Sequence, residues 1–256
     1  MALRAALYGL FAGSTLVLGA LLGLYLKISR RTIAVIMSFG AGVLISALAF
    51  DLMDEAYRLG GFDSPTIGFA VGAILYVVGD WAVNQWGGHF RKDTINKRHL
   101  ARKPAEAGGS GLAIFIGALL DGIPETMSIG VGLLAGKGVG FVVVIAVFLS
   151  NLPEGISGAV SMSRAGWTKR NVFLMWSAVA LMCSLSSVFG YQVLGHSGPD
   201  ARAVVLAIAA GAILAMVAAT MIPEAFDDEG RLTPVVTPLT TAAGFLLASA
   251  LSHLVK

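Results

Sequence analysis

The chain has 256 residues, of which 56% are hydrophobic and 13% are charged, and its formal net charge at pH 7 is +3. Soluble domains carry about 25% charged residues, so this composition excludes a disordered chain, a disulfide-stapled secreted module and an ordinary cytosolic enzyme. The single cysteine, Cys183, cannot form an internal disulfide, and no CxxC pair or Cys/His cluster indicates a thiolate metal site. The remaining class is a membrane protein with several spans.

Eight apolar runs are long enough to cross a bilayer, which takes about 20 residues in a helix. They lie near residues 5–26, 32–53, 65–86, 111–134, 139–162, 172–194, 203–224 and 235–255. The longest gap, residues 87–110, is a basic loop rather than a soluble domain. We therefore expect an all-α, polytopic membrane protein in which residues 1–256 form a single transmembrane domain.

Lys and Arg are divided unequally between the two sides of these spans. If the N-terminus is outside, the inner segments hold 13 of the 18 basic residues and the outer segments hold 5. Cytoplasmic loops of membrane proteins carry an excess of Lys and Arg. We therefore expect both termini outside, the 87–110 loop in the cytoplasm, and a location in the cell membrane.

A weak internal repeat relates spans one to three to spans six to eight at one constant offset along the chain. The paired spans run in opposite directions, as in the inverted-topology repeats of transporters. This pattern predicts a 3+2+3 arrangement in which spans four and five lie between the repeats. The identities that define the offset are Ala41/Ala210, Gly42/Gly211, Ala49/Ala218, Glu55/Glu224 and Ala56/Ala225.

Six carboxylates and no Lys or Arg lie inside the predicted spans. An acid at the centre of a span costs on the order of 2.5–3.5 kcal/mol. Without a basic partner, each acid must be protonated, hydrated or bound to a cation. The excess of acids therefore indicates a path for cations. The six are Asp51, Asp80, Asp121, Glu125, Glu154 and Glu224.

The middles of spans four and five carry matching polar groups. Asp121 and Glu125 share one face of span four, because residues at i and i+4 lie on the same side of a helix. Ser150 and Glu154 have the same spacing in span five, with Asn151 beside them. Antiparallel neighbours bring these groups to one depth, near the bilayer midplane where transporters keep their substrate sites.

A proline precedes the glutamate in both spans. Pro124 and Pro153 each remove a backbone donor, so the carbonyls of Leu120 and Leu149 lose their usual partners. Free carbonyls, an amide and carboxylates together offer the oxygen ligands that a divalent cation prefers. The alternative is that the prolines only kink the helices for packing and the acids are protonated.

Further acids lie at the ends of the spans. Asp51, Asp54 and Glu55 close the outer end of span two and are candidates for a cation entrance. Glu224, with the acids of residues 227–229, is a candidate for an exit on the inner side. Solvated helix ends are the alternative in both places. Asp80 and Asn84, one turn apart, are expected to be a hydrogen-bonded packing pair.

The segments Asp121-Gly-Ile-Pro-Glu125 and Ser150-Asn-Leu-Pro-Glu-Gly155 resemble the paired metal-site motifs of the ZIP (Zrt/Irt-like protein) family of divalent metal transporters. The resemblance covers nearly the whole chain, including the eight spans, the outward termini and the inverted three-helix repeats. It implies that Asp121, Glu125 and Glu154 are metal ligands, with Asn151 and Ser150 at further ligand positions. Glu154 would bridge the ions if two metals bind.

The metal site departs from the family pattern, which usually has histidine where this chain has Asp121 and Ser150. Gly122 lies at a further ligand position of the family but has no side chain to bind a metal. In span six the only possible ligands are Cys183 and serines such as Ser184. Imidazole suits zinc, whereas carboxylate and carbonyl groups suit harder ions. We therefore expect Zn²⁺ as the family default, with Mn²⁺, Fe²⁺ or Cd²⁺ as alternatives.

The sequence thus predicts a transporter that moves divalent metal into the cytosol, and not an enzyme; no HExxH motif occurs. The alternatives are a proton-coupled permease for a small solute, with Asp121 and Glu154 as a proton relay, and a metal sensor or scaffold that does not transport. The expected partners are the transported ion, the lipid bilayer and a second copy in a homodimer, with no nucleic acid and no resident cofactor.

Overall fold

The computed structural model describes residues 1–85, 107–134, 139–226 and 233–255. Within these ranges all the regular structure is helical, and eight helical stretches are long and apolar enough to cross a membrane. The predicted all-α class and the eight spans are therefore confirmed. In chain order the helices are α1 (Ala2–Tyr25), α2 (Arg30–Ala47), η1 (Leu48–Met53), α3 (Asp54–Gly60), α4 (Asp63–Val83), α6 (Ala107–Gly132), α7 (Val139–Arg164), α8 (Lys169–Gly195), α9 (Pro199–Met216), η5 (Val217–Met221), α10 (Ile222–Phe226) and α11 (Thr233–Val255).

Two of the spans are each built from three helical pieces. The pieces η1 and η5 are π-helical, and each continues an α-helix without a break. Thus α2, η1 and α3 form the second span, Arg30–Gly60, and α9, η5 and α10 form the seventh, Pro199–Phe226. Most of the basic loop predicted over residues 87–110 lies outside the described residues, which resume at residue 107. Helix α6 begins at Ala107, so the last residues of the predicted loop are helical.

Local sequence accounts for several helix ends. The Ser29 hydroxyl accepts a hydrogen bond from the backbone N–H of Thr32 at 3.1 Å and so caps α2. Thr168 caps α8 in the same way through the N–H of Asn171, at 3.2 Å. Such caps satisfy backbone donors that the first turn of a helix leaves without partners.

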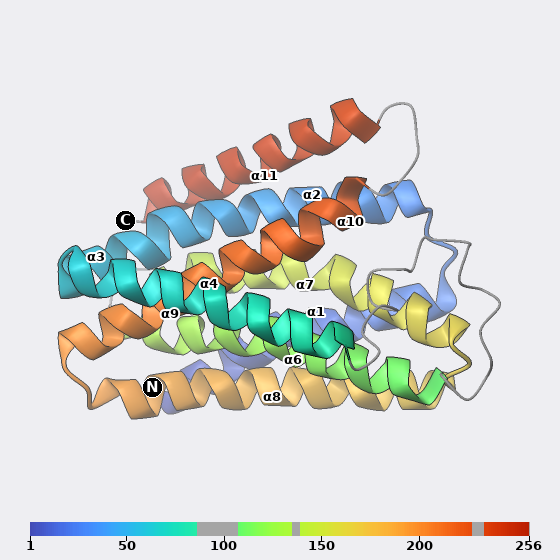
Figure 1. Cartoon of the computed structure of the whole chain (residues 1–256), viewed down its shortest axis with the longest axis horizontal. Helices are drawn as coiled ribbons and strands as arrows, with labels where there is room; N and C mark the ends of the chain where they lie inside the picture. The colour runs from blue at the N-terminus through green and yellow to red at the C-terminus, as the bar shows by residue number, and fades with distance from the viewer. Residues whose placement is uncertain (86–106, 135–138, 227–232, 256) are drawn as a thin grey trace.

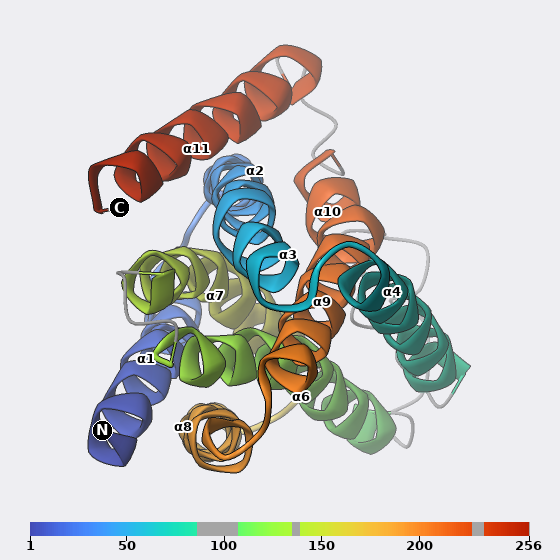
Figure 2. The same cartoon turned by 90° about the vertical axis from the view of Figure 1, so that its left-hand side faces the viewer.

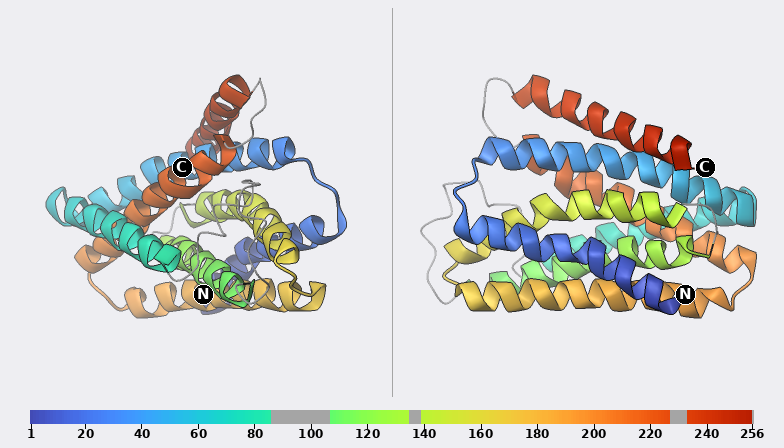
Figure 3. Two further views of the ribbon diagram at one scale, coloured as in Figure 1. Left: turned by 45° about the vertical axis from the view of Figure 1, so that its right-hand side comes forward. Right: turned by 180° about the vertical axis from the view of Figure 1, so that it is seen from behind.

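Four helices form the centre of the bundle and four surround it (Figure 2). The spans that contain α2, α6, α7 and α9 are 56–61% buried over their most apolar windows, against 22–44% for the other four. Among the outer helices, α4 packs on α9, α11 packs on α2, and α1 packs on both α7 and α8. The view from behind shows α1 beside α8 (Figure 3).

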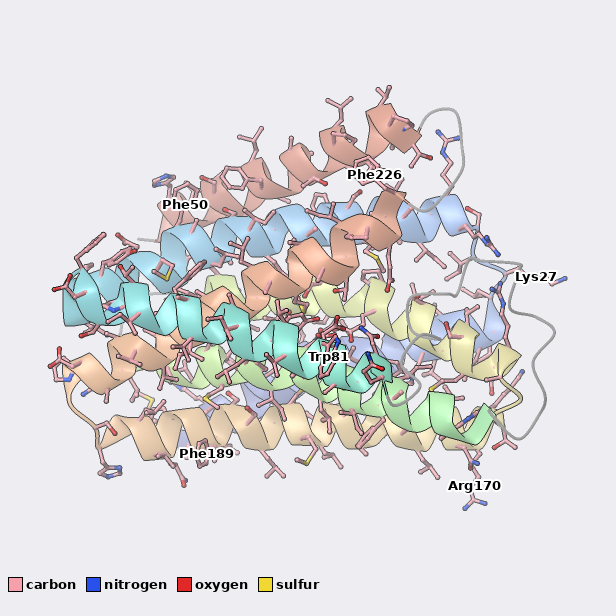
Figure 4. The ribbon with its side chains drawn as sticks, viewed as in Figure 1. Lys27, Phe50, Trp81, Arg170, Phe189 and Phe226 are labelled. Carbon is pink, nitrogen blue, oxygen red and sulfur yellow. The ribbon has the colours of Figure 1, made fainter. Side chains whose placement is uncertain are left out.

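Both termini lie at one end of the bundle (Figure 1). Lys27 and Arg170, from two segments predicted to be cytoplasmic, lie at the opposite end (Figure 4). The two ends therefore separate the segments as the distribution of basic residues predicts. We refer to the ends below as the terminal end and the basic end.

The inverted repeat is visible in the π-helical pieces. The first begins at Leu48 and the second at Val217, which is the same offset that pairs Ala41 with Ala210. A π-helical turn inserts an extra residue into the helix and occurs often at functional sites. Its recurrence at the predicted offset confirms that the second and seventh spans are counterparts.

Close helix contacts repeat with the same symmetry. A side chain at Gly42 of α2 would overlap the carbonyl oxygen of Thr241 in α11, and one at Gly211 of α9 would overlap that of Phe69 in α4. The two glycines are related by the repeat offset, but Phe69 and Thr241 are three positions further apart than that offset. The predicted offset is therefore wrong for the third helix of each repeat, where equivalent residues are three positions further apart.

The first helix of each repeat makes equivalent contacts as well. Gly19 of α1 packs against the Leu152 carbonyl of α7, and Gly190 of α8 packs against the Met127 carbonyl of α6. Helices α1 and α8 are thus counterparts, and so are α6 and α7. Gly19 and Gly190 are two positions further apart than the repeat offset, so the predicted offset is wrong for the first helix too.

These contacts also set the register between the two central helices. Because Met127 and Leu152 are equivalent, the counterpart of Glu125 in α7 is Ser150. The two Pro-Glu motifs match each other in sequence but not in this register. Glu154 therefore lies one helical turn beyond the symmetric partner of Glu125.

Candidate metal site

A cavity of about 40 Å³ lies among the central helices and α8. Its polar lining consists of Asp121, Glu125, Ser150, Glu154, Ser157, Ser161, Thr220 and Glu224. Its other lining residues are Met37, Ile114, Gly158, Trp176, Met216 and Met221. A cavity of this size holds about three water molecules, so a partly hydrated ion fits in it.

Four of the six predicted membrane acids line this cavity: Asp121, Glu125, Glu154 and Glu224. The lining residues that the structure describes include no Lys, Arg or His. Asp121 is 3% exposed and Glu125 is 1% exposed, so both carboxyl groups have left bulk water. The cavity therefore collects negative charge in a region where charge is poorly solvated.

Glu125 has the least favourable environment of these acids. Its Oε2 atom is buried and accepts no hydrogen bond from the described part of the chain. Glu154 lines the same cavity, so two carboxyl groups share this poorly solvated space. A buried carboxylate in this situation requires a proton or a cation.

The acids alone do not provide a complete set of metal ligands. Across residues 1–85, 107–134, 139–226 and 233–255, no three Asp, Glu, His or Cys side chains converge closely enough to hold an ion. An ion in this conformation would complete its coordination with hydroxyl oxygens or water, as hard cations commonly do.

The two remaining predicted ligands differ in their surroundings. Ser150 lines the cavity, and its hydroxyl donates to the Val147 carbonyl at 3.0 Å. The amide nitrogen of Asn151 donates to the Ala12 carbonyl of α1 at 3.1 Å. The structure thus brings Asp121, Glu125, Ser150 and Glu154 to one cavity, while Asn151 ties α7 to α1.

Helix α6 continues through Pro124, and α7 continues through Pro153. Near Pro124, side-chain hydroxyl groups donate hydrogen bonds to backbone carbonyls. Thr126 donates to the Gly122 carbonyl at 2.6 Å, and Ser186 of α8 donates to the Ile123 carbonyl at 2.9 Å. These bonds are additional to the helical ones, since the carbonyl that loses its donor to Pro124 is that of Leu120.

The cavity extends from the middle of the bundle toward the basic end. Met37, Ile114 and Trp176 each lie within two turns of the residue at which α2, α6 or α8 begins, and Ser161 is close to the last residue of α7. In the other half, the counterparts of Met221 and Glu154 are Leu52 and Ile129, which are at most 1% exposed. This cavity therefore extends toward the basic end, and neither Leu52 nor Ile129 is among its lining residues.

The predicted entrance residues lie in the other half, toward the terminal end. Asp51 accepts a hydrogen bond from Ser252 of α11 at 2.7 Å, and Glu55 forms an ion pair with Arg58 at 2.9 Å. Asp51 and Glu55 are buried, whereas Asp54 is exposed. None of these three acids is among the lining residues of the cavity. The acids of residues 227–229 lie outside the described residues.

Span three contributes polar groups as well. Asn84 donates to Asp80 at 3.0 Å, which confirms the expected packing pair. One turn earlier, the hydroxyl of Tyr76 donates to Oδ1 of Asp121 at 2.9 Å. The sequence analysis missed this contact, as it missed Thr220 and the three methionines of the lining. The sequence signal for this contact was the position of Tyr76, one helical turn before the membrane acid Asp80.

The helical fold and the acid-lined cavity define a multi-pass membrane transport protein. Its sequence matches the model of the ZIP zinc transporter family over residues 84–252, and the chain belongs to that family. The predicted resemblance is confirmed, divalent metal ions are its transported substrates, and the family identity points to transport rather than catalysis.

Curated relatives extend the similarity over most of the chain. The zinc transporter ZupT of an Escherichia coli O7:K1 strain is 25% identical over 228 residues, which cover 88% of each chain. ZupT of Salmonella heidelberg is 26% identical over the same shares. A putative zinc transporter of Arabidopsis thaliana, At3g08650, is 24% identical over 87% of this chain and 35% of its own length.

Proposed function

We propose that the protein moves Zn²⁺ across the cell membrane into the cytosol and binds it at Asp121, Glu125 and Glu154. Ser150 lines the cavity and supplies a further oxygen ligand, whereas Asn151, the other predicted ligand, holds α7 against α1 through Ala12. The observation that carries this proposal is the buried Oε2 atom of Glu125, which lacks a donor in the described chain and shares the cavity with Glu154. A divalent cation between these carboxylates removes their repulsion and satisfies both.

The size of the cavity supports a small cargo. About 40 Å³ accommodates an ion with a few waters. The family identity and this volume together favour metal transport over the proton-coupled permease. The same acids can still exchange protons when the metal leaves.

The proposed route uses the symmetry of the repeats. The cation enters at the terminal end past Asp51, Asp54 and Glu55, and it leaves along the lining toward Glu224 at the basic end. Because the repeats are inverted, an exchange of their conformations closes one half and opens the other. The basic end is cytoplasmic in this proposal, as its excess of Lys and Arg supports.

The donor set bears on the choice of metal. Carboxylate and hydroxyl oxygens suit Mn²⁺ and Fe²⁺, while the thioethers of Met37, Met216 and Met221 in the same lining suit softer ions. Zn²⁺ is borderline and accepts both kinds of ligand. We therefore rank Zn²⁺ first, with Cd²⁺, Fe²⁺ and Mn²⁺ as competing cargoes, and Glu154 as the bridge if two ions bind.

Uptake of radioactive Zn²⁺ into proteoliposomes tests the proposal. We expect Glu125→Gln and Glu154→Gln each to lower the initial rate at subsaturating Zn²⁺ by at least about tenfold, because a metal contact is lost. Asp63→Asn is the matched control, since Asp63 is an exposed acid at the first turn of α4 and should tolerate the change.

Wild-type rates in both glutamine variants would overturn the assignment of the site. Absence of uptake by the wild-type protein, for all four metals and in both directions across the vesicle membrane, would overturn the proposed function itself. Competition among Zn²⁺, Cd²⁺, Fe²⁺ and Mn²⁺ in the same assay ranks the cargoes.

A further inference from the structure

Tyr76 lies on the one buried stripe of α4. The buried residues of this helix follow helical spacing (Pro65, Gly68, Gly72, Tyr76, Asp80 and Val83), whereas neighbours such as Leu75 and Val77 are exposed on its lipid-facing side. The Tyr76 side chain is 2% exposed. Its hydroxyl group therefore points into the protein, where it meets the carboxylate of Asp121.

The contact joins Tyr76 directly to the candidate metal site. Its hydroxyl donates to Asp121 Oδ1 at 2.9 Å, and Asp121 in turn lines the acid cavity. A hydrogen bond to a charged acceptor is stronger and more directional than one between neutral groups. It fixes the orientation in which the carboxylate faces the cavity.

The position of Tyr76 is itself held by close helix packing. One turn away, a side chain at Gly72 would overlap the Ile208 carbonyl of α9, and Gly211 of α9 makes the reciprocal contact with Phe69. The backbones of α4 and α9 therefore touch at Phe69 and Gly72, within the two turns before Tyr76. Because α4 is fixed on α9, the tyrosine is a rigid donor rather than a mobile one.

The repeat symmetry distinguishes this bond from general packing. The counterpart of Tyr76 in α11 is Ala248, and the counterpart of Asp121 in α7 is Ala146; both alanines are buried. The helices thus pack at the symmetric place without a hydroxyl or a carboxylate. The Tyr76–Asp121 bond is present in one half only, at the acid cavity.

We propose that Tyr76 is a positioning residue for cation binding: it orients the Asp121 carboxylate toward the ion and links the binding helix α6 to the α4–α9 pair. This inference rests on the proposed function, and it assigns to span three a role in metal affinity.

The test compares Tyr76→Phe with wild-type protein in Zn²⁺ uptake. This change removes one oxygen atom and keeps the buried ring. We expect the KM for Zn²⁺ to rise roughly tenfold, the factor that one hydrogen bond to a charged group supplies, while the maximal rate stays within about twofold. Tyr191→Phe on α8, outside the cavity lining, is the matched control and should keep the wild-type KM.

A double-mutant cycle separates positioning from a structural role. In an Asp121→Ala background, which removes the acceptor, Tyr76→Phe should change the KM by less than about twofold, because residues that act through one contact are not additive. Equilibrium binding of Zn²⁺ to the detergent-solubilised variants gives the same comparison without transport. An equal effect of Tyr76→Phe in both backgrounds, or a lower melting temperature with an unchanged KM, would overturn the inference.

The two proposals fail in different ways. If the wild-type protein neither binds nor transports any of the metals, the proposed function and this inference fall together. If the wild type transports Zn²⁺ and Tyr76→Phe keeps its KM, the role of Tyr76 alone is rejected.

Discussion

Glu55 of α3 and Glu224 of α10 are counterparts in the inverted repeat, yet they lie in opposite environments. They occupy equivalent positions, because each follows a π-helical segment at the same place in its span. Glu55 is 4% exposed and paired with Arg58, whereas Glu224 lines the cavity. The two repeats therefore hold two different arrangements of one local pattern, and an exchange between them would move the opening from one end to the other.

This asymmetry predicts which positions water-soluble reagents reach. Met221 lines the cavity, while its counterpart Leu52 is 1% exposed. In a Cys183→Ser background, we expect Met221→Cys to react at least about tenfold faster than Leu52→Cys with a charged thiol reagent, because a minor open state is populated at about 10% or less. The measurement is the labelling rate in membranes without added metal.

Lipid exposure must be distinguished from water access in that experiment. Leu181 is 59% exposed on the outer face of α8, so Leu181→Cys reports reagent that arrives through the lipid phase. It should label slowly. Equal rates at Met221→Cys and Leu52→Cys would contradict a structure that is closed toward the terminal end.

Replacement of Glu125 should separate stability from function. Its buried oxygen without a donor in the described chain is unfavourable in the metal-free protein. We expect Glu125→Gln to leave the melting temperature unchanged or to raise it by a few degrees, at about 2–4 °C per kcal/mol for a chain of this size, while Zn²⁺ uptake is lost. Thermal unfolding in detergent, with and without Zn²⁺, measures this.

The added metal provides the control. Zn²⁺ should raise the melting temperature of the wild-type protein, since a ligand that binds only the folded state stabilises it, and should have little effect on Glu125→Gln. A melting temperature several degrees below that of the wild type would instead assign Glu125 a structural role.

The spans and the Pro-Glu motifs could be predicted from the sequence because both depend on local features. Hydrophobic length defines a span, and a spacing of four residues puts Asp121 and Glu125 on one face of a helix whatever surrounds it. The structure agrees with these predictions: both carboxylates line one cavity.

The contacts of Tyr76 and Asn151 could not be predicted in the same way. The tyrosine meets Asp121 only because Gly72 sets the rotation and depth of α4 against α9. Asn151 donates to Ala12 because α1 packs closely on α7. Both contacts join residues far apart in the sequence, and their geometry is decided by helix packing that no local pattern encodes.

The symmetric glycine contacts should be equally sensitive to substitution. A methyl group at Gly42 or Gly211 would overlap a backbone carbonyl, which cannot move as a flexible side chain can. We expect Gly42→Ala and Gly211→Ala each to destabilise the protein by about 1–3 kcal/mol, as overpacking does. The measurement is the melting temperature together with the yield of monodisperse protein.

A glycine with ordinary space around it is the matched control. A Cβ atom at Gly195, at the end of α8, would lie 3.5 Å from a Leu134 methyl group, a normal contact. Gly195→Ala should therefore stay within about 0.5 kcal/mol of the wild type. Destabilisation by only one of the two buried variants would contradict the symmetric packing of the second and seventh spans.

Methionine in the cavity lining should affect the choice among metals. Met216 is 3% exposed and contributes a thioether at the junction of α9 and η5. Replacement by leucine conserves volume and typically costs less than about 1.5 kcal/mol, but it removes the soft sulfur ligand. We expect Met216→Leu to lower Cd²⁺ uptake relative to Mn²⁺ uptake by about threefold or more, because thioethers favour soft ions.

The relevant readout is the ratio of the two uptake rates in one preparation, since that ratio does not depend on the amount of active protein. Met182→Leu is the control, because Met182 is 40% exposed on the outer side of α8 and is not among the lining residues. Its ratio should equal that of the wild type. An unchanged ratio in Met216→Leu would mean that oxygen ligands alone select the metal, which would move Mn²⁺ and Fe²⁺ ahead of Cd²⁺ as cargoes.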